Sequence, residues 1–173
     1  MIAGLESILD GFELGVPSER PIDELRALRH ELDAVEVGLS YGRRMAQGRL
    51  DILLCELDRR SGDGTAELIA LLPDVLSQHL RGAGMPRPLR DVELPSFADH
   101  IVDELDVLLA PSELGSLAEL PVERLHAAID DLRNAEREIS QQRREAHRMI
   151  DELQEEIIGR YRSGAASVDD LLK

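Results

Sequence analysis

One amphipathic segment occurs twice in this sequence, and each position of the second copy is numbered 100 higher than in the first. The copies begin at Pro21 and Pro121, and the first turn of a helix tolerates proline. Apolar residues then follow in steps of three and four, with one step of seven, at positions 25, 28, 32, 35, 39, 46, 50, 53 and 57 and at their counterparts. This spacing is that of a coiled-coil seam, so it predicts two long helices, about 21–60 and 121–162.

The connector, residues 61–120, determines how the two long helices run relative to each other. The run Ser61–Gly64 has the turn chemistry that ends a helix. Short amphipathic helices are predicted at about 65–80 and 97–110, with Ser96 as a candidate N-cap for the second. A parallel pair would require the connector to cover roughly 60 Å, at about 1.5 Å per residue of helix. An antiparallel pair needs no such span, so it is the simpler topology.

These features predict an all-α fold, namely an antiparallel two-helix coiled coil of long helices with short connector helices. At 173 residues the chain is expected to form a single domain. The tail, 163–173, is predicted to be a flexible linker with at most one final helical turn.

The charge balance restricts the possible partners. Acidic residues outnumber basic ones by 35 to 20, and the formal net charge is −15. Non-specific binding along a nucleic-acid backbone needs a basic surface, so no direct contact with nucleic acid is expected. An acidic chain can instead bind a basic protein and hide the nucleic-acid-binding face of that protein.

Cysteine usage and hydropathy bear on the cellular compartment. Cys55 is the only cysteine, which rules out an intramolecular disulfide and a zinc site built on several cysteines. Residues 1–15 lack the basic start and continuous apolar core of a signal peptide, and no apolar run approaches the length of a membrane span. The chain is therefore expected to be cytoplasmic and not to contact a membrane.

A stripe of five polar side chains borders the seam in each copy. The stripes are Glu36, Ser40, Arg43, Gln47 and Asp51, and Glu136, Ser140, Arg143, His147 and Asp151. At about 100° per residue, each set lies within an arc of about 80° on one helix face. Solvated coiled-coil flanks commonly carry charges, but such flanks need only complementary sign. The recurrence of serine, a poor ion-pair residue, favours a surface matched to a ligand.

The chemistry of the stripes fits guanine and phosphate. Carboxylates accept hydrogen bonds from the ring N–H and amino group of guanine, and arginine donates to O6 and N7 or grips phosphate. Serine, glutamine and histidine can donate to phosphate oxygens. Two copies related by a pseudo-two-fold axis suit a ligand that is itself two-fold symmetric. A cyclic dinucleotide of two guanylates is one candidate among several.

The pattern E-x3-S-x2-R-x3-Q-x3-D in two helices resembles the signature of the RsiG family of actinobacterial anti-sigma factors. Residues 36–51 (EVGLSYGRRMAQGRLD) match the pattern in full. Residues 136–151 (EREISQQRREAHRMID) match it except that His147 replaces glutamine. The resemblance covers both long helices, around half of the chain.

The resemblance implies that the two motif helices form an antiparallel coiled coil that binds a cyclic-di-GMP dimer through the ten stripe residues. It further implies that the loaded protein holds a sigma factor of the WhiG class, related to flagellar sigma factors, away from RNA polymerase. The family role is to restrain sporulation or differentiation genes. No catalytic activity is expected, and histidine at 147 can still donate or accept a hydrogen bond.

Four other interpretations remain open from the sequence. A structural coiled-coil adaptor without a nucleotide would carry the same stripes as ordinary flanking charges. An enzyme that makes or degrades the nucleotide is a distant third, because no catalytic or metal-binding set is visible. Glu123 and His126 have metal-type spacing but no second copy. Gly38, Gly42 and Gly48 within the first helix indicate either close approach of a partner or tolerated drift.

Overall fold

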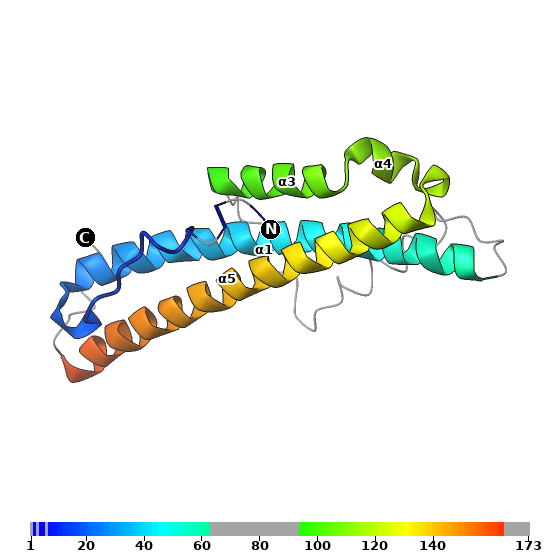
Figure 1. Cartoon of the computed structure of the whole chain (residues 1–173). Coiled ribbons are helices and arrows are strands. Elements are labelled where there is room, and N and C mark those ends of the chain that lie inside the picture. The colour runs from blue at the N-terminus through cyan, green and yellow to red at the C-terminus, as the bar shows by residue number, and fades with distance from the viewer. Residues whose placement is uncertain (1, 3, 6, 63–93, 165–173) are drawn as a thin grey trace.

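The computed structural model describes residues 2, 4, 5, 7–62 and 94–164, and all regular structure in these ranges is helical. Two long helices, α1 (Ile22–Ser61) and α5 (Val122–Ser163), lie side by side and run antiparallel (Figure 1). The shorter elements are η1 (Pro17–Glu19), α3 (Ser96–Leu108), α4 (Pro111–Gly115) and η2 (Leu117–Glu119). The predicted all-α class and the pair of long helices are confirmed.

The repeated apolar seam forms the interface between α1 and α5. Every seam position of both copies is buried or half-buried, and those with no solvent exposure include Leu25, Leu39, Leu132 and Ile139. Full burial of such a side chain contributes about 1.5–3 kcal/mol. The packing of this seam therefore holds together two helices that are otherwise largely polar.

Helix α3 covers the face of α1 that lies away from the stripe, and we call this face the back. The two glycines of α1 that lie beneath α3 make this approach possible. A Cβ atom on Gly42 would lie 2.7 Å from Ile101 Cγ2, and one on Gly38 would lie 2.8 Å from Pro95 Cγ. Arg49 of α1 also pairs with Asp106 of α3. These glycines therefore accommodate α3 of the same chain, whereas a Cβ on Gly48 would meet nothing within 4 Å.

The N-terminal segment covers the corresponding face of α5. The backbone N–H of Ile2 donates to Oε2 of Glu138 at 3.0 Å, and Ile2, Leu5 and Leu9 are buried. Leu5 and Leu9 correspond by repeat position to the buried Leu105 and Leu109. The repeat therefore extends further towards the N-terminus than the helix periodicity indicates.

An arginine clamp closes each end of the helix pair. Arg60 donates to the carbonyl oxygens of Leu120 and Leu117 at 2.7 and 2.5 Å. At the other end, Arg160 donates to those of Arg20 and Pro17 at 2.6 and 2.8 Å. Each donor and acceptor of the second clamp is the repeat counterpart of one in the first. The clamps satisfy carbonyls of the turns η1 and η2, which precede the long helices.

A carboxylate one helical turn earlier orients each clamp arginine. Glu56 accepts from Arg60 Nε at 2.7 Å, and Glu156 accepts from Arg160 Nε at the same distance. Glu56 also accepts two hydrogen bonds from Arg59 and is almost fully buried. The two hydrogen bonds from Arg59, followed by the one from Arg60, outweigh burial and hold the pKa of Glu56 at about 2.

Two details of the connector differ from expectation or lie outside the described residues. Ser96 was the candidate N-cap of the second connector helix, but that helix begins at Ser96 itself, with Pro95 at the N-cap position and no side-chain cap. That expectation is wrong because Pro95 already fixes the extended backbone before the helix. The helix predicted at 65–80 and the tail at 165–173 lie outside the described residues.

The glycines of α1 generate the first prediction. Gly42→Ala should lower the free energy of unfolding by about 1–3 kcal/mol, because the new methyl group displaces the buried Ile101. Gly48→Ala is the matched control, and it should raise that free energy by about 0.5–1 kcal/mol, since it adds helix propensity in open space. Urea denaturation followed by circular dichroism measures both. Equal effects of the two variants would contradict the close packing of α3.

The Glu56 clamp generates a second prediction, on acid stability. Because the pKa of Glu56 is lowered from 4.5 to about 2, its ionised form stabilises the fold fully above about pH 4.5, and this contribution is lost as the pH falls towards 2. Glu56→Gln should therefore cost about 2 kcal/mol at pH 7, after allowance for screening at its half-exposed partners.

The difference in free energy of unfolding between wild type and the Glu56→Gln variant should be smaller at pH 3 than at pH 7, as measured by urea denaturation. Glu156→Gln is the control, because Glu156 is more exposed and accepts from one arginine only. It should cost less than about 1 kcal/mol. If the Glu56→Gln variant lost the same stability at pH 7 and at pH 3, the low pKa of Glu56 would be contradicted.

Candidate functional site

The two polar stripes face each other across the front of the helix pair, opposite the face that α3 covers. In α1 the stripe and the glycines under α3 lie on opposite sides of the helix, at about 100° per residue. The antiparallel pairing brings the middle of one stripe against the beginning of the other. The structure thus brings together eight of the ten predicted residues in two cross-helix clusters.

The first cluster is centred on Glu36 of α1. Its Oε1 accepts from Ser40 Oγ at 2.6 Å within the helix and from Arg143 Nε of α5 at 2.9 Å. Arg143 Nε also donates to Ser40 Oγ at 2.8 Å, and His147 Nε2 lies 3.2 Å from Glu36 Oε1. One carboxylate therefore gathers a hydroxyl, a guanidinium and an imidazole.

The second cluster is the repeat counterpart of the first and is centred on Glu136. Its Oε1 accepts from Ser140 Oγ at 2.8 Å and from Gln47 Nε2 at 3.3 Å. Arg43 Nη1 lies 3.6 Å from the same oxygen. The contacts are longer than in the first cluster, in which Arg143 also bonds Ser40, but the four residues correspond in the repeat. The front therefore carries a pseudo-two-fold arrangement of donors and acceptors.

The surroundings of Glu36 favour its ionised form. Burial of Glu36 raises its pKa, but hydrogen bonds from Ser40 and Arg143 and the charges of His147 and Arg143 oppose burial. Together they hold the pKa of Glu36 below its ordinary value. Glu36 therefore remains a hydrogen-bond acceptor to a lower pH than an ordinary glutamate.

The remaining two stripe residues lie towards opposite ends of the front. Asp51 is half-buried and Asp151 is exposed. Each lies one helical turn beyond the last cluster residue of its own helix, Gln47 or His147. They place an acceptor beyond each cluster, so each half of the front presents acceptors on both sides of an arginine.

The front can exchange hydrogen bonds with a ligand of mixed character. Each cluster contains one carboxylate, one arginine, one hydroxyl and one amide or imidazole, and these groups satisfy one another. A ligand that offers both donors and acceptors can replace these contacts without leaving a charge unpaired. A purely apolar or purely cationic ligand cannot do so.

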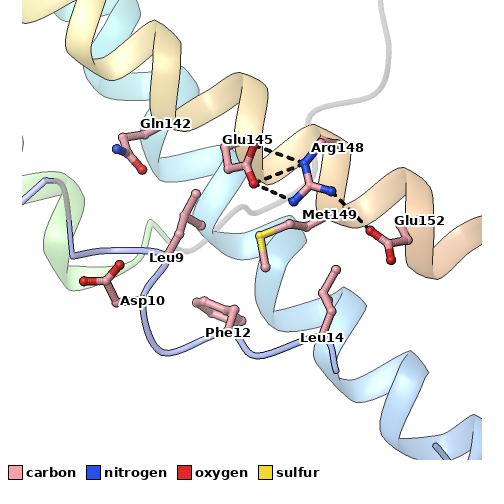
Figure 2. Close-up of a pocket in the computed structure, with 9 residues that line it drawn as sticks. All are labelled: Leu9, Asp10, Phe12, Leu14, Gln142, Glu145, Arg148, Met149 and Glu152. Atoms are coloured by element: carbon pink, nitrogen blue, oxygen red, sulfur yellow. Dashed lines mark hydrogen bonds and ion pairs between the residues drawn. The ribbon is translucent and has the colours of Figure 1, made fainter. Parts of the chain in front are cut away.

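A hollow of about 580 Å³ lies at the back of α5, beneath the N-terminal segment. Figure 2 shows Leu9 and Phe12 near Met149, with Arg148 held between Glu145 and Glu152. None of the ten stripe residues lines this hollow. It is therefore separate from the candidate site.

Sequence reasoning missed which residues pair across the seam, because each stripe was considered on its own helix. It also missed the clamp residues Arg60 and Arg160. Their signal was present, since the spacing of Glu56 and Arg60 recurs at Glu156 and Arg160.

The described residues offer neither a metal centre nor a membrane span. In residues 2–62 and 94–164, as far as described, no group of three or more His, Cys, Asp or Glu side chains could hold a metal ion. Glu123 and His126 are both exposed on α5. Over the same ranges, no helix combines the length and apolarity that crossing a bilayer requires.

Comparison with known proteins identifies a family. The model of the RsiG-like family matches residues 15–78 and 111–173. These ranges contain α1, α5 and all ten stripe residues, and they confirm the family resemblance carried by the two motifs. No curated protein matches this chain.

The cross-helix pairs generate a prediction that needs no ligand. A double-mutant cycle of Glu36→Gln and Arg143→Gln should give a coupling of about 1 kcal/mol, since both side chains are mostly buried. The Glu136 and Arg43 cycle is the matched control, and its longer, more exposed pair should give about half as much.

The coupling between Glu36 and Arg143 should weaken in acid. A carboxyl whose pKa is lowered on folding stabilises the protein above its ordinary pKa, and this effect is lost as the pH falls through the lowered value. Urea denaturation of the four proteins at pH 7 and pH 3 measures this. A coupling near zero at pH 7 would show that the pair adds nothing to the stability of the free protein.

Proposed function

Because this chain belongs to the RsiG-like family, we propose that it is an anti-sigma factor regulated by cyclic-di-GMP. Family membership suggests the anti-sigma role. We further propose that the ten stripe residues bind a cyclic-di-GMP dimer, and that the loaded protein sequesters a sigma factor of the WhiG or flagellar class. In this role the chain is a cytoplasmic, non-catalytic regulator that restrains sporulation or differentiation genes.

The observation that carries the proposal is the pairing of two matching clusters across the seam. Glu36 with Arg143 and Glu136 with Arg43 are related by the repeat and lie on the face opposite α3. A symmetric ligand can then make the same contacts with both helices. A cyclic dinucleotide of two guanylates has this symmetry and carries both donors and acceptors.

Binding would proceed by exchange of partners. Glu36 and Glu136 would transfer from arginine to the ring N–H and amino groups of guanine. Asp51 and Asp151 would accept hydrogen bonds from the same kinds of groups. The freed Arg43 and Arg143 would donate to guanine O6 and N7 or to phosphate. The serines, with Gln47 and His147, would donate to the remaining oxygens.

A ligand held by both stripes would restrain the helix pair. It would add contacts between α1 and α5 near the centre of the coiled coil, where Ala46 and Ala146 leave the seam with small side chains. A more rigid pair presents its acidic surface in one arrangement, and this lowers the cost of ordering on binding a basic partner. The nucleotide would thereby promote capture of the sigma factor.

One observation favours a second candidate, a structural coiled-coil adaptor without a nucleotide. The central stripe residues satisfy one another in the free protein, as ordinary interhelical flanking charges do. The adaptor predicts that melting does not respond to nucleotide. It also predicts that Ser40 and Ser140 can be replaced by Glu or Lys without loss of function.

The proposed function predicts that cyclic-di-GMP binds the wild-type protein, alone or with a WhiG-class sigma factor, in titration calorimetry. Arg43→Ala combined with Arg143→Ala should weaken nucleotide binding about 100-fold or more, because two charge-assisted contacts are lost. Arg137→Ala is the control, since Arg137 is exposed and bonds only within its own helix. It should bind like wild type.

A co-purification assay tests the partner. A co-expressed WhiG-class sigma factor should remain with the wild-type chain when cyclic-di-GMP is added, and should be lost from the double variant. If no nucleotide binds with or without the sigma factor, the proposal is wrong. If the double variant keeps both partners, the stripes have been misassigned.

A further inference from the structure

Arg44 and Arg144 differ from almost all other arginines in the described part of the chain. Within residues 7–62 and 94–164, every arginine except these two and Arg162 has a hydrogen bond or an ion pair with another described residue. Both are exposed. In a protein with a net charge of −15, these two cations, unpaired among the described residues and at matching repeat positions, are available to an external anion.

Both residues lie at the rim of the front. Arg44 follows Arg43 of its stripe directly, and Arg144 follows Arg143 in the same way. Arg44 is also four residues after Ser40 and three before Gln47, the spacings at which helix side chains are neighbours. Each unpaired guanidinium can therefore reach the stripe from its solvent side.

The arginines within the clusters are already paired with carboxylates, so further positive charge is needed to bind phosphate. Arg143 pairs with Glu36 and Arg43 with Glu136, so the clusters offer little net positive charge. A cyclic dinucleotide carries two phosphates, and the rest of this acidic chain repels them. Arg44 and Arg144 supply positive charge beside the clusters that no carboxylate of the described residues neutralises.

We propose that Arg44 and Arg144 form a second pair of ligand contacts, outside the ten stripe residues, that bind the phosphates of the cyclic dinucleotide. This assignment rests on the proposed function. The motif arginines remain with the carboxylates until the ligand arrives, while the rim arginines attract and hold its phosphates. A planar guanidinium suits phosphate because it can donate two parallel hydrogen bonds.

The spacing of the two residues suits a two-fold ligand. Arg143 of α5 lies level with Glu36 and Ser40 of α1. The next residue, Arg144, is therefore about seven residues from Arg44 along the coiled-coil axis, which is roughly 10 Å. The two are on opposite sides of the pseudo-two-fold axis. In the free protein Arg144 lies along the outer side of α5, where it borders a hollow with Gln141, Gln142, Glu145 and Arg148. No described residue binds it there. Its side chain has to turn from this hollow towards the front to bind phosphate there.

The test is titration calorimetry of cyclic-di-GMP into wild type and into the double variant Arg44→Gln, Arg144→Gln, at several NaCl concentrations and with the sigma factor present if wild type requires it. The double variant should bind about 100-fold more weakly, about tenfold for each lost charge-assisted contact. Its affinity should also depend less on salt, because fewer ions are released when phosphate binds. Its melting temperature should match wild type, since neither side chain has a partner to lose among the described residues.

Arg162→Gln is the matched control, because Arg162 is exposed and unpaired among the described residues but lies far from the stripes on α5. It should keep wild-type affinity within about twofold. If wild type binds and the double variant binds equally well with the same salt dependence, the phosphate assignment alone is overturned. If the double variant keeps the nucleotide and loses only the sigma factor, the pair belongs to a protein interface instead. If wild type binds no nucleotide at all, the proposed function fails and this assignment fails with it.

Discussion

The stagger between α1 and α5 is the constraint on which the candidate site depends. The apolar seam closes in one register, and this register sets Glu36 level with Arg143 and Glu136 level with Arg43. A shift of one helix by a single turn would move these groups about 5 Å along the axis and break both clusters. The clamps at Arg60 and Arg160 resist such a shift, because each joins the end of one long helix to the turn that precedes the other.

The covering of the back leaves the front available. Gly38 and Gly42 let α3 approach the backbone of α1, and the N-terminal segment occupies the corresponding place on α5. Apolar side chains on that side are thereby buried, including Ile101 and Leu9. Polar residues on the opposite side need no such cover. The same two helices thus bury apolar side chains on one face and present hydrogen-bonding groups on the other.

Much of this arrangement could be predicted from the sequence, because helix periodicity and repeat position are local properties. The seam predicted α1 and α5 to within about one residue at each end, and the repeated pattern predicted ten residues of which eight meet in two clusters. The pairing of Glu36 with Arg143 could not be predicted, because it depends on the stagger between helices. The docking of α3 on Gly42 was likewise invisible, since a glycine in a helix does not specify what approaches it. The burial of Leu5 and Leu9 escaped prediction because the N-terminal segment lacks a helical period.

The pseudo-two-fold symmetry of the front bears on the orientation in which a third molecule can dock. A ligand with two-fold symmetry looks the same from either end of the coiled coil, so it conveys no direction to a third molecule. Direction has to come from the parts of the chain that break the symmetry. These are the α-helical cover on α1, the turn-rich cover on α5, and the exchange of Gln47 for His147. A partner that always docks in one orientation must therefore touch at least one of these unequal features, however many of its contacts are with the symmetric face.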